Sequence, residues 1–326
     1  SFHKIKKMMT VRMIDLKEEI TDVSEDPISQ NGEFSKSYKG VFQRKRHGHI
    51  IRHDCVIKKI RIESKSRDDI ATFSKEIQKQ NSFKHPSILG ILGFSIPFLA
   101  NQEDYVIVTP YMKNGSLHNI LQKELKGEAP NKWTATTRAI NVLGITAGLC
   151  YIHEKDMIHR NLKTENILLD DDFYPKICDF GYQMTLRYRM ENLYQCDLGI
   201  LHPEFLNDEE FDYKSDIYSY AMILYEIFEL KMVFEEMNKN RALIDIMKGQ
   251  RPAIDNDEKF PNFFKDLIKK CWNDDHHSRP SFNEILKSMI SAYKSEEIFN
   301  NDVDREIIDE DLEDVIESLN INNDSK

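Results

Sequence analysis

The feature that most restricts the fold of this 326-residue chain is a change in hydrophobic periodicity along its length. In the first third, β-branched residues cluster in two runs typical of buried strands, at 50–62 and 105–109. Between them, residues 68–83 lack Gly and Pro and repeat apolar residues at helical spacing. Helical patterns dominate later, at 134–153, 215–230, 262–271 and 281–293. The pattern predicts an α+β protein, in which a small strand-rich lobe with one helix precedes a larger, mostly helical lobe.

Charge is distributed unevenly along the chain. Lys and Arg total 45 and Asp and Glu total 55, but residues 295–326 alone contain twelve acidic and two basic residues. Residues 1–294 are therefore neutral as a whole, and the basic face needed for binding nucleic acid is not indicated. Within the acidic tail, apolar residues recur at 308, 312, 315 and 319. They predict one short amphipathic helix that is packed on the body, frayed, or paired with a partner in a coiled coil.

The five cysteines include no C-x-x-C pair, so neither a zinc site nor a disulfide framework is indicated. We therefore expect a reducing, cytoplasmic location. The longest uncharged stretch, 87–102, contains a proline and is too short to span a bilayer, so we expect no membrane span. The chain begins at Ser1 and not at Met, which suggests a fragment or a processed form of a longer protein.

The most informative stretch is HRNLKTENILL at 159–169, followed by DFG at 179–181. It resembles the catalytic core of the eukaryotic protein kinases, whose pattern is H-R-D-L-x-x-x-N and then D-F-G. Only Asn161, in place of Asp, departs from the specified positions. The resemblance spans about residues 28–293 and implies a bilobal protein-kinase fold. Its parts would be an N-terminal extension (1–27), the N-lobe and hinge (28–112), the C-lobe (113–294) and the acidic tail (295–326).

The resemblance implies an electrostatic role for each matched residue, because phosphoryl transfer depends on positioning and on neutralising phosphate charge. Lys58 in CVIKK would hold the α- and β-phosphates of ATP and pair with Glu76. Asp179 and Asn166 would provide the oxygen ligands that Mg²⁺ prefers. Lys163 matches the catalytic-loop lysine expected near the γ-phosphate.

The expected ATP site departs from the family pattern. The segment QNGEFSKSYKG places Gln30, Gly32 and Ser35 at the three glycines of the glycine-rich loop, and only Gly32 is kept. The extra side chains hinder close backbone approach to phosphate, and Val56 in place of the family's alanine narrows the adenine site. The remaining adenine contacts implied by the family are the gatekeeper Thr109, the Pro110 carbonyl, the Met112 N–H and Leu168.

Asn161 decides the functional interpretation, because an amide cannot accept the substrate hydroxyl's proton as the family's aspartate does. Losing a general base costs about 10²–10⁴ in rate. The favoured interpretation is that the chain is a pseudokinase. It would act as a nucleotide-modulated binding or scaffolding module for a protein partner or an active kinase. The alternative is a weakly active ATP-dependent serine/threonine kinase. Departures elsewhere, including Asp197 in place of a threonine, favour natural loss over a single introduced substitution.

Several residues indicate an intact scaffold. Glu204 and Arg279 match a buried ion pair of the C-lobe, and Asp216 matches the helix aspartate that anchors the catalytic loop. Tyr218, the hinge sequence and the Cys-Trp ending point to the tyrosine-kinase-like group. Thr185 is a possible phosphorylation site that Arg160 would contact, although an unregulated loop is an equal alternative.

Overall fold

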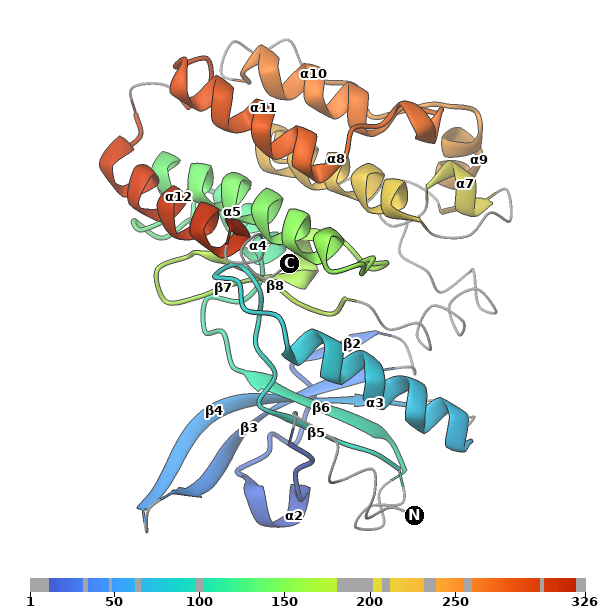
Figure 1. The fold of residues 1–326 in the computed structure, drawn as a ribbon, viewed down its shortest axis with the longest axis vertical. Coiled ribbons are helices and arrows are strands. Elements are labelled where there is room, and N and C mark those ends of the chain that lie inside the picture. Colours follow the sequence, from blue (N-terminus) through green and yellow to red (C-terminus); the bar gives the residue numbers. More distant parts are fainter. Residues whose placement is uncertain are drawn as a thin grey trace. The chain divides into compact units, whose positions relative to one another are not determined.

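The computed structural model describes residues 12–31, 35–46, 49–61, 66–97, 103–180, 202–206, 212–231, 239–254, 260–299 and 302–320. They form two compact units, each of which is described by itself (Figure 1). The first contains the described residues up to Lys84 together with Leu89–Tyr111. The second contains His85–Ile88 and the described residues from Met112 onward.

The first unit is an antiparallel sheet with strand order β1-β3-β4-β6-β5, and β2 also pairs with β3. Its elements are α2 (Leu16–Glu19), β1 (Ile20–Thr21), β2 (Ser29–Asn31), β3 (Ser35–Arg46), β4 (His49–Ile60), α3 (Arg67–Asn81), β5 (Gly93–Ser95) and β6 (Tyr105–Pro110). The predicted strands correspond to β4 and β6. The pattern did not indicate β3, because most of its residues are polar and it owes its strand conformation to pairing with β4 over its whole length.

Helix α3 begins at a capping box in which Ser66 and Asp69 exchange hydrogen bonds. Its apolar stripe covers one face of the sheet. This shared cluster includes Ile60, Phe73, Ile77, Phe94 and Ile107. The other face holds a second cluster, which includes Cys55, Ile57, Val106 and Val108. Because side chains alternate along a strand, this packing fixes which residues of β4 face α3.

The second unit is mostly helical and contains one short hairpin, β7–β8. Its elements are α4 (Leu117–Leu125), α5 (Ala135–Glu154), η1 (Thr164–Asn166), β7 (Ile167–Leu169), β8 (Pro175–Ile177), α7 (Pro203–Leu206), α8 (Tyr213–Glu229), α9 (Lys239–Met247), α10 (Asn262–Cys271), η4 (His276–Ser278), α11 (Phe282–Lys294) and α12 (Arg305–Asn320). The predicted α+β fold, with a strand-rich region before a helical one, is confirmed.

Helix α5 is the buried centre of the second unit, and almost every residue after its first turn is inaccessible. Two glycines on α5 allow β8 to lie directly against it. A Cβ atom on Gly144 would come within 2.9 Å of Pro175, and one on Gly148 within 2.6 Å of Ile177. This close contact fixes the hairpin that leads into the DFG segment.

The acidic tail forms helix α12, which packs on α5. Its apolar residues Ile308, Leu312 and Val315 are buried. The backbone N–H of Asp304 donates to Oγ1 of Thr136 at 2.8 Å, and so ties the start of the helix to α5. The sequence left open whether this helix is packed on the body, frayed or paired in a coiled coil. The structure shows the helix packed on the body.

Candidate active site

The catalytic-loop segment lies between α5 and β7, and Asp216 of α8 holds its backbone. The carboxylate of Asp216 accepts hydrogen bonds from the N–H of His159 (2.6 Å), the N–H of Arg160 (3.0 Å) and Nε2 of His153 (2.8 Å). Arg160 has a left-handed φ of 64°, a conformation that costs energy in a non-glycine residue. The hydrogen bond to its N–H explains how this conformation is maintained.

Two titratable groups of this cluster are fully buried. Burial alone would raise the pKa of Asp216, but the hydrogen bond and charge of His153 outweigh it and hold that pKa below its ordinary value. Burial lowers the pKa of His159 to about 4, against the opposing effect of Asp216. At neutral pH, an ionised Asp216 therefore fixes the loop and His159 is uncharged.

Asn161 takes part in the loop network through its backbone. Its N–H donates to Nδ1 of the neutral His159 ring at 3.2 Å, and its carbonyl accepts from Nδ2 of Asn166 at 2.7 Å. Lys163 contributes its carbonyl, which accepts from the N–H of Asn166 at 3.0 Å. The loop thus brings Asn161, Lys163 and Asn166 together, and Asn161 contributes its backbone N–H and carbonyl.

Asn166 also joins this loop to the DFG segment. Its carbonyl accepts from the N–H of Cys178 at 3.0 Å, and the Phe180 ring lies 5.7 Å from the His159 ring. Asp179, between Cys178 and Phe180 in the sequence, has a left-handed φ of 60°. Because Nδ2 of Asn166 donates within the loop, its amide oxygen is the atom that would ligate a metal together with the carboxylate of Asp179, and this role stays a prediction. These hard oxygen donors fit Mg²⁺.

In the sheet unit, Lys58 lies on β4 and Glu76 lies on α3, the helix that packs against one face of the sheet. Lys58 is paired with Ile107 across β4 and β6, so both residues face α3. Glu76 is on α3, next to the buried Ile77, and both charged side chains are partly buried. Their roles toward ATP stay predictions.

The other residues that the sequence predicts to bind ATP have the following positions in the structure. Val56 and Thr109 are directly paired across β4 and β6 on the same face as Lys58. Pro110 ends β6 and Met112 begins the second unit, where Leu168 lies on β7 opposite Lys176. Gly32, Thr185 and Asp197 lie outside the described residues.

Glu204 of α7 and Arg279 form a buried ion pair, and Arg279 is only 1% exposed. Burial opposes ionisation of Glu204, but hydrogen bonds from His202 and Arg279 outweigh it and lower its pKa to about 2. The Arg279 guanidinium also lies 5.1 Å from the centre of the Tyr218 ring. The pair ties α7 to the segment before α11.

The sequence reasoning missed two groups of the loop. His153, at the end of α5, binds Asp216, and Thr164 donates from Oγ1 to Oε2 of Glu226 on α8 at 2.6 Å. Neither has a distinctive spacing.

Among the described residues, no helix is long and apolar enough to cross a membrane.

The comparisons with known proteins agree with this geometry. Residues 27–289 match the family described as protein tyrosine and serine/threonine kinase, so the chain belongs to the protein kinase family. It is 31% identical over 243 residues to serine/threonine-protein kinase 12 of Arabidopsis thaliana, covering 72% of this chain and 51% of that protein. It is 32% identical over 241 residues to receptor-interacting serine/threonine-protein kinase 1 of Homo sapiens, covering 68% and 34%. The chain thus spans about half or less of these relatives.

Proposed function

We propose that this kinase domain is a pseudokinase of the tyrosine-kinase-like group, acting as a nucleotide-modulated binding or scaffolding module for a protein partner or an active kinase. The observation that carries the proposal is Asn161, which occupies the place of the family's base in a loop that Asp216 still anchors. The fold that would present a binding surface is kept, while the group that would accept a proton is absent.

The residues of the chain would have the following roles in nucleotide binding. Asn166 and Asp179 would hold Mg²⁺, which supplies positive charge to the phosphates of ATP when bound. Lys58, oriented by Glu76, would hold the α- and β-phosphates, and Lys163 would lie near the γ-phosphate. The amide of Asn161 could hydrogen-bond a substrate hydroxyl, but it has no basic lone pair with which to accept the proton.

Substitution of Asn161 by Asp tests this proposal. If the missing base were the sole defect, Asn161→Asp would raise the rate of phosphoryl transfer about 10²–10⁴-fold. We expect the absolute activity of Asn161→Asp to stay low, because Gln30, Ser35 and Val56 still weaken nucleotide binding in this variant. The measurement is transfer of radioactive phosphate from ATP to a generic protein substrate.

Two further measurements make this test specific. Asp179→Asn, in both backgrounds, removes a metal ligand and reveals any contaminating kinase. A thermal shift with ATP, with and without Mg²⁺, reports nucleotide binding independently of turnover. Robust activity of Asn161→Asp that Asp179→Asn abolishes would refute loss of function at several positions.

The second candidate function is slow serine/threonine phosphorylation. It is favoured by the hydrogen bonds that still hold the loop, and the relatives compared are serine/threonine kinases by name. Wild-type turnover that is sensitive to Asp179→Asn would support this candidate. We also propose a cytoplasmic location, with which the free thiols of Cys55, Cys150, Cys178 and Cys271 agree.

A further inference from the structure

The strands β3 and β4 extend beyond their neighbours as a two-stranded projection (Figure 1). β6 pairs with β4 only from Cys55 onward, and β1 pairs with β3 only at Val41 and Phe42. We call residues 44–46 of β3 and 49–53 of β4 the basic arm. They include four Lys or Arg residues, two His and no acid, whereas residues 1–294 as a whole are neutral. The arm is thus a local concentration of positive charge.

The register of the arm places one aliphatic side chain among the bases on each face. Lys45 lies directly opposite Ile50, and Arg52 is on the same face, two residues along β4. Ile50 is 62% exposed, which is the highest value among the exposed large apolar residues of the described part of the chain. On the other face, Arg44 lies opposite Ile51, which is 38% exposed. The face with Ile50 therefore presents an apolar knob flanked by two positive charges.

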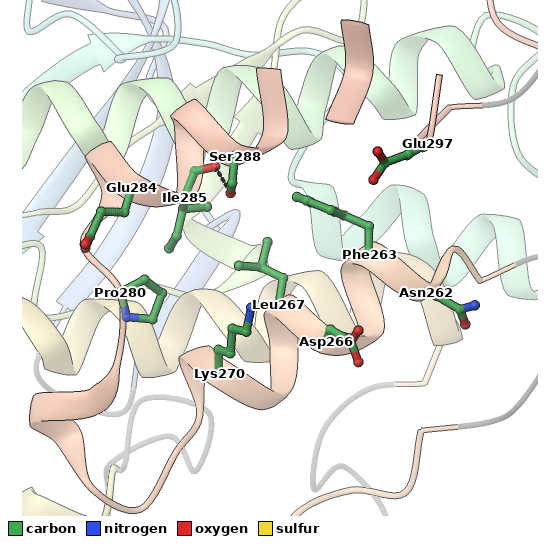
Figure 2. A pocket seen from close by; sticks show the side chains of 10 residues that line it. All are labelled: Asn262, Phe263, Asp266, Leu267, Lys270, Pro280, Glu284, Ile285, Ser288 and Glu297. Atoms are coloured by element: carbon green, nitrogen blue, oxygen red, sulfur yellow. Dashed lines mark hydrogen bonds between the residues drawn. The ribbon is translucent and has the colours of Figure 1, made fainter. Parts of the chain in front are cut away.

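The helical unit contains a pocket of about 670 Å³ between α10 and α11 (Figure 2). Four of the residues that line it have apolar side chains: Phe263, Leu267, Pro280 and Ile285. Figure 2 shows Phe263 and Leu267 of α10 extending toward the side of Ile285 on α11. The pocket can therefore accept an aliphatic side chain.

The rim of this pocket is acidic. Asp266, Glu284 and Glu297 line it with one base, Lys270, and all four are exposed. Hydrogen bonds from Ser281 lower the pKa of Glu284, which is therefore ionised at neutral pH. The pocket thus combines an apolar floor with an excess of negative charge at its edge, the complement of the Ile50 face of the arm.

We propose that the basic arm of one copy of this chain docks into the α10–α11 pocket of a second copy. Ile50 enters the apolar floor, and Lys45 and Arg52 approach Asp266 and Glu297. Because the arm and the pocket are different surfaces, the contact is heterologous and can repeat from copy to copy. This self-association goes beyond the proposed function and requires neither nucleotide nor Asn161.

Charge reversal on each side provides the test. In Lys45→Glu/Arg52→Glu the arm would repel the pocket, and in Asp266→Lys/Glu297→Lys the pocket would repel the arm. All four side chains are exposed, so the fold should be kept. Glu284 is left unchanged because it caps α11. By sedimentation, we expect each variant alone to associate at least about tenfold more weakly than wild type.

Mixing the two variants is the decisive measurement. Each arm then meets a pocket of opposite charge, so the mixture should regain the association that both proteins lack alone. Added salt should weaken association of the wild type and of the mixture. Ile50→Thr should also weaken it, whereas the matched control Ile51→Thr, on the opposite face, should not.

Three outcomes would overturn the proposal: a wild type that stays monomeric at every concentration, association that charge reversal leaves unchanged, or a mixture that fails to recover. Vesicles containing phosphatidylserine provide a separate comparison. Arm-dependent binding to these vesicles by a monomeric wild type would assign the arm to an anionic membrane instead. Equal loss with Ile50→Thr and Ile51→Thr would overturn the assignment of the Ile50 face.

Discussion

The two units hold their candidate catalytic residues in different ways. In the helical unit, Asn161 and Asn166 lie in a loop whose backbone is fixed by the buried carboxylate of Asp216. In the sheet unit, Lys58 and Glu76 lie on a regular strand and a regular helix, which apolar packing stabilises. Replacing Asp216 should therefore disturb the fold of the helical unit. Replacing Lys58 or Glu76 should have less effect on the fold of the sheet unit.

In both units, the chain departs from the kinase pattern at residues whose backbone groups take part in the local structure. Asn161 joins the loop network through its backbone N–H and carbonyl, which any residue other than proline would supply. Gln30 and Ser35 are paired in regular register with Lys36 and Asn31 of the β2–β3 hairpin. The departures fall at positions where the backbone determines the local fold, so that nucleotide and substrate chemistry can be lost while the structure is kept.

The largest effect should come from breaking the buried ion pair of the helical unit. Arg279→Met leaves the carboxylate of Glu204 buried without its main counter-charge, which should lower the free energy of unfolding by about 3–5 kcal/mol. The control is Lys132→Met, which removes the exposed ion pair with Asp172 and should cost below about 1 kcal/mol. Urea unfolding measures both. A similar cost for the two changes would contradict the role given to buried charge.

A somewhat smaller effect should follow from changing the anchor of the catalytic loop. Asp216→Asn keeps the size of the side chain but has one acceptor oxygen for three donors, and should cost about 2–3 kcal/mol. Hydrogen exchange at the amide of Arg160 should become faster, because its N–H donates to this carboxylate. Asp266→Asn, on an exposed part of α10, is the control and should change neither measurement.

The buried His159 should make the stability of the helical unit depend on pH. Its pKa is lowered from 6.5 to about 4, so the unfolded chain takes up a proton at a higher pH than the folded one. The resulting stabilisation is present above pH 6.5 and is lost as the pH falls toward 4, by about 3 kcal/mol. His159→Gln should flatten unfolding curves measured across this range, whereas His277→Gln, at an exposed position, should not. An unchanged slope in His159→Gln would remove His159 as the cause.

The sequence was sufficient to predict the fold class and the order of the main elements, because periodicity and the kinase motifs are both local signals. It located β4, β6, α3 and α5 to within a few residues. It did not indicate β3, whose polar residues form a strand only because β4 pairs with them. The bond from His153 to Asp216 was also missed, because it joins residues 63 apart in sequence and depends on the packing of α5 against α8.

The smallest change in stability should come from restoring a glycine of the family pattern in the sheet unit. Ser35 is buried at the start of β3, opposite Ile60. Ser35→Gly should cost only about 0.5–1 kcal/mol, the usual penalty for glycine in a strand. If the serine side chain hinders approach of phosphate, this change should also increase the thermal shift produced by ATP and Mg²⁺. Ser37→Gly is the matched control, because it replaces the same residue type on the same strand at a position where the family has valine. An equal gain from both substitutions would mean that loosening of β3, and not the glycine position, controls nucleotide binding.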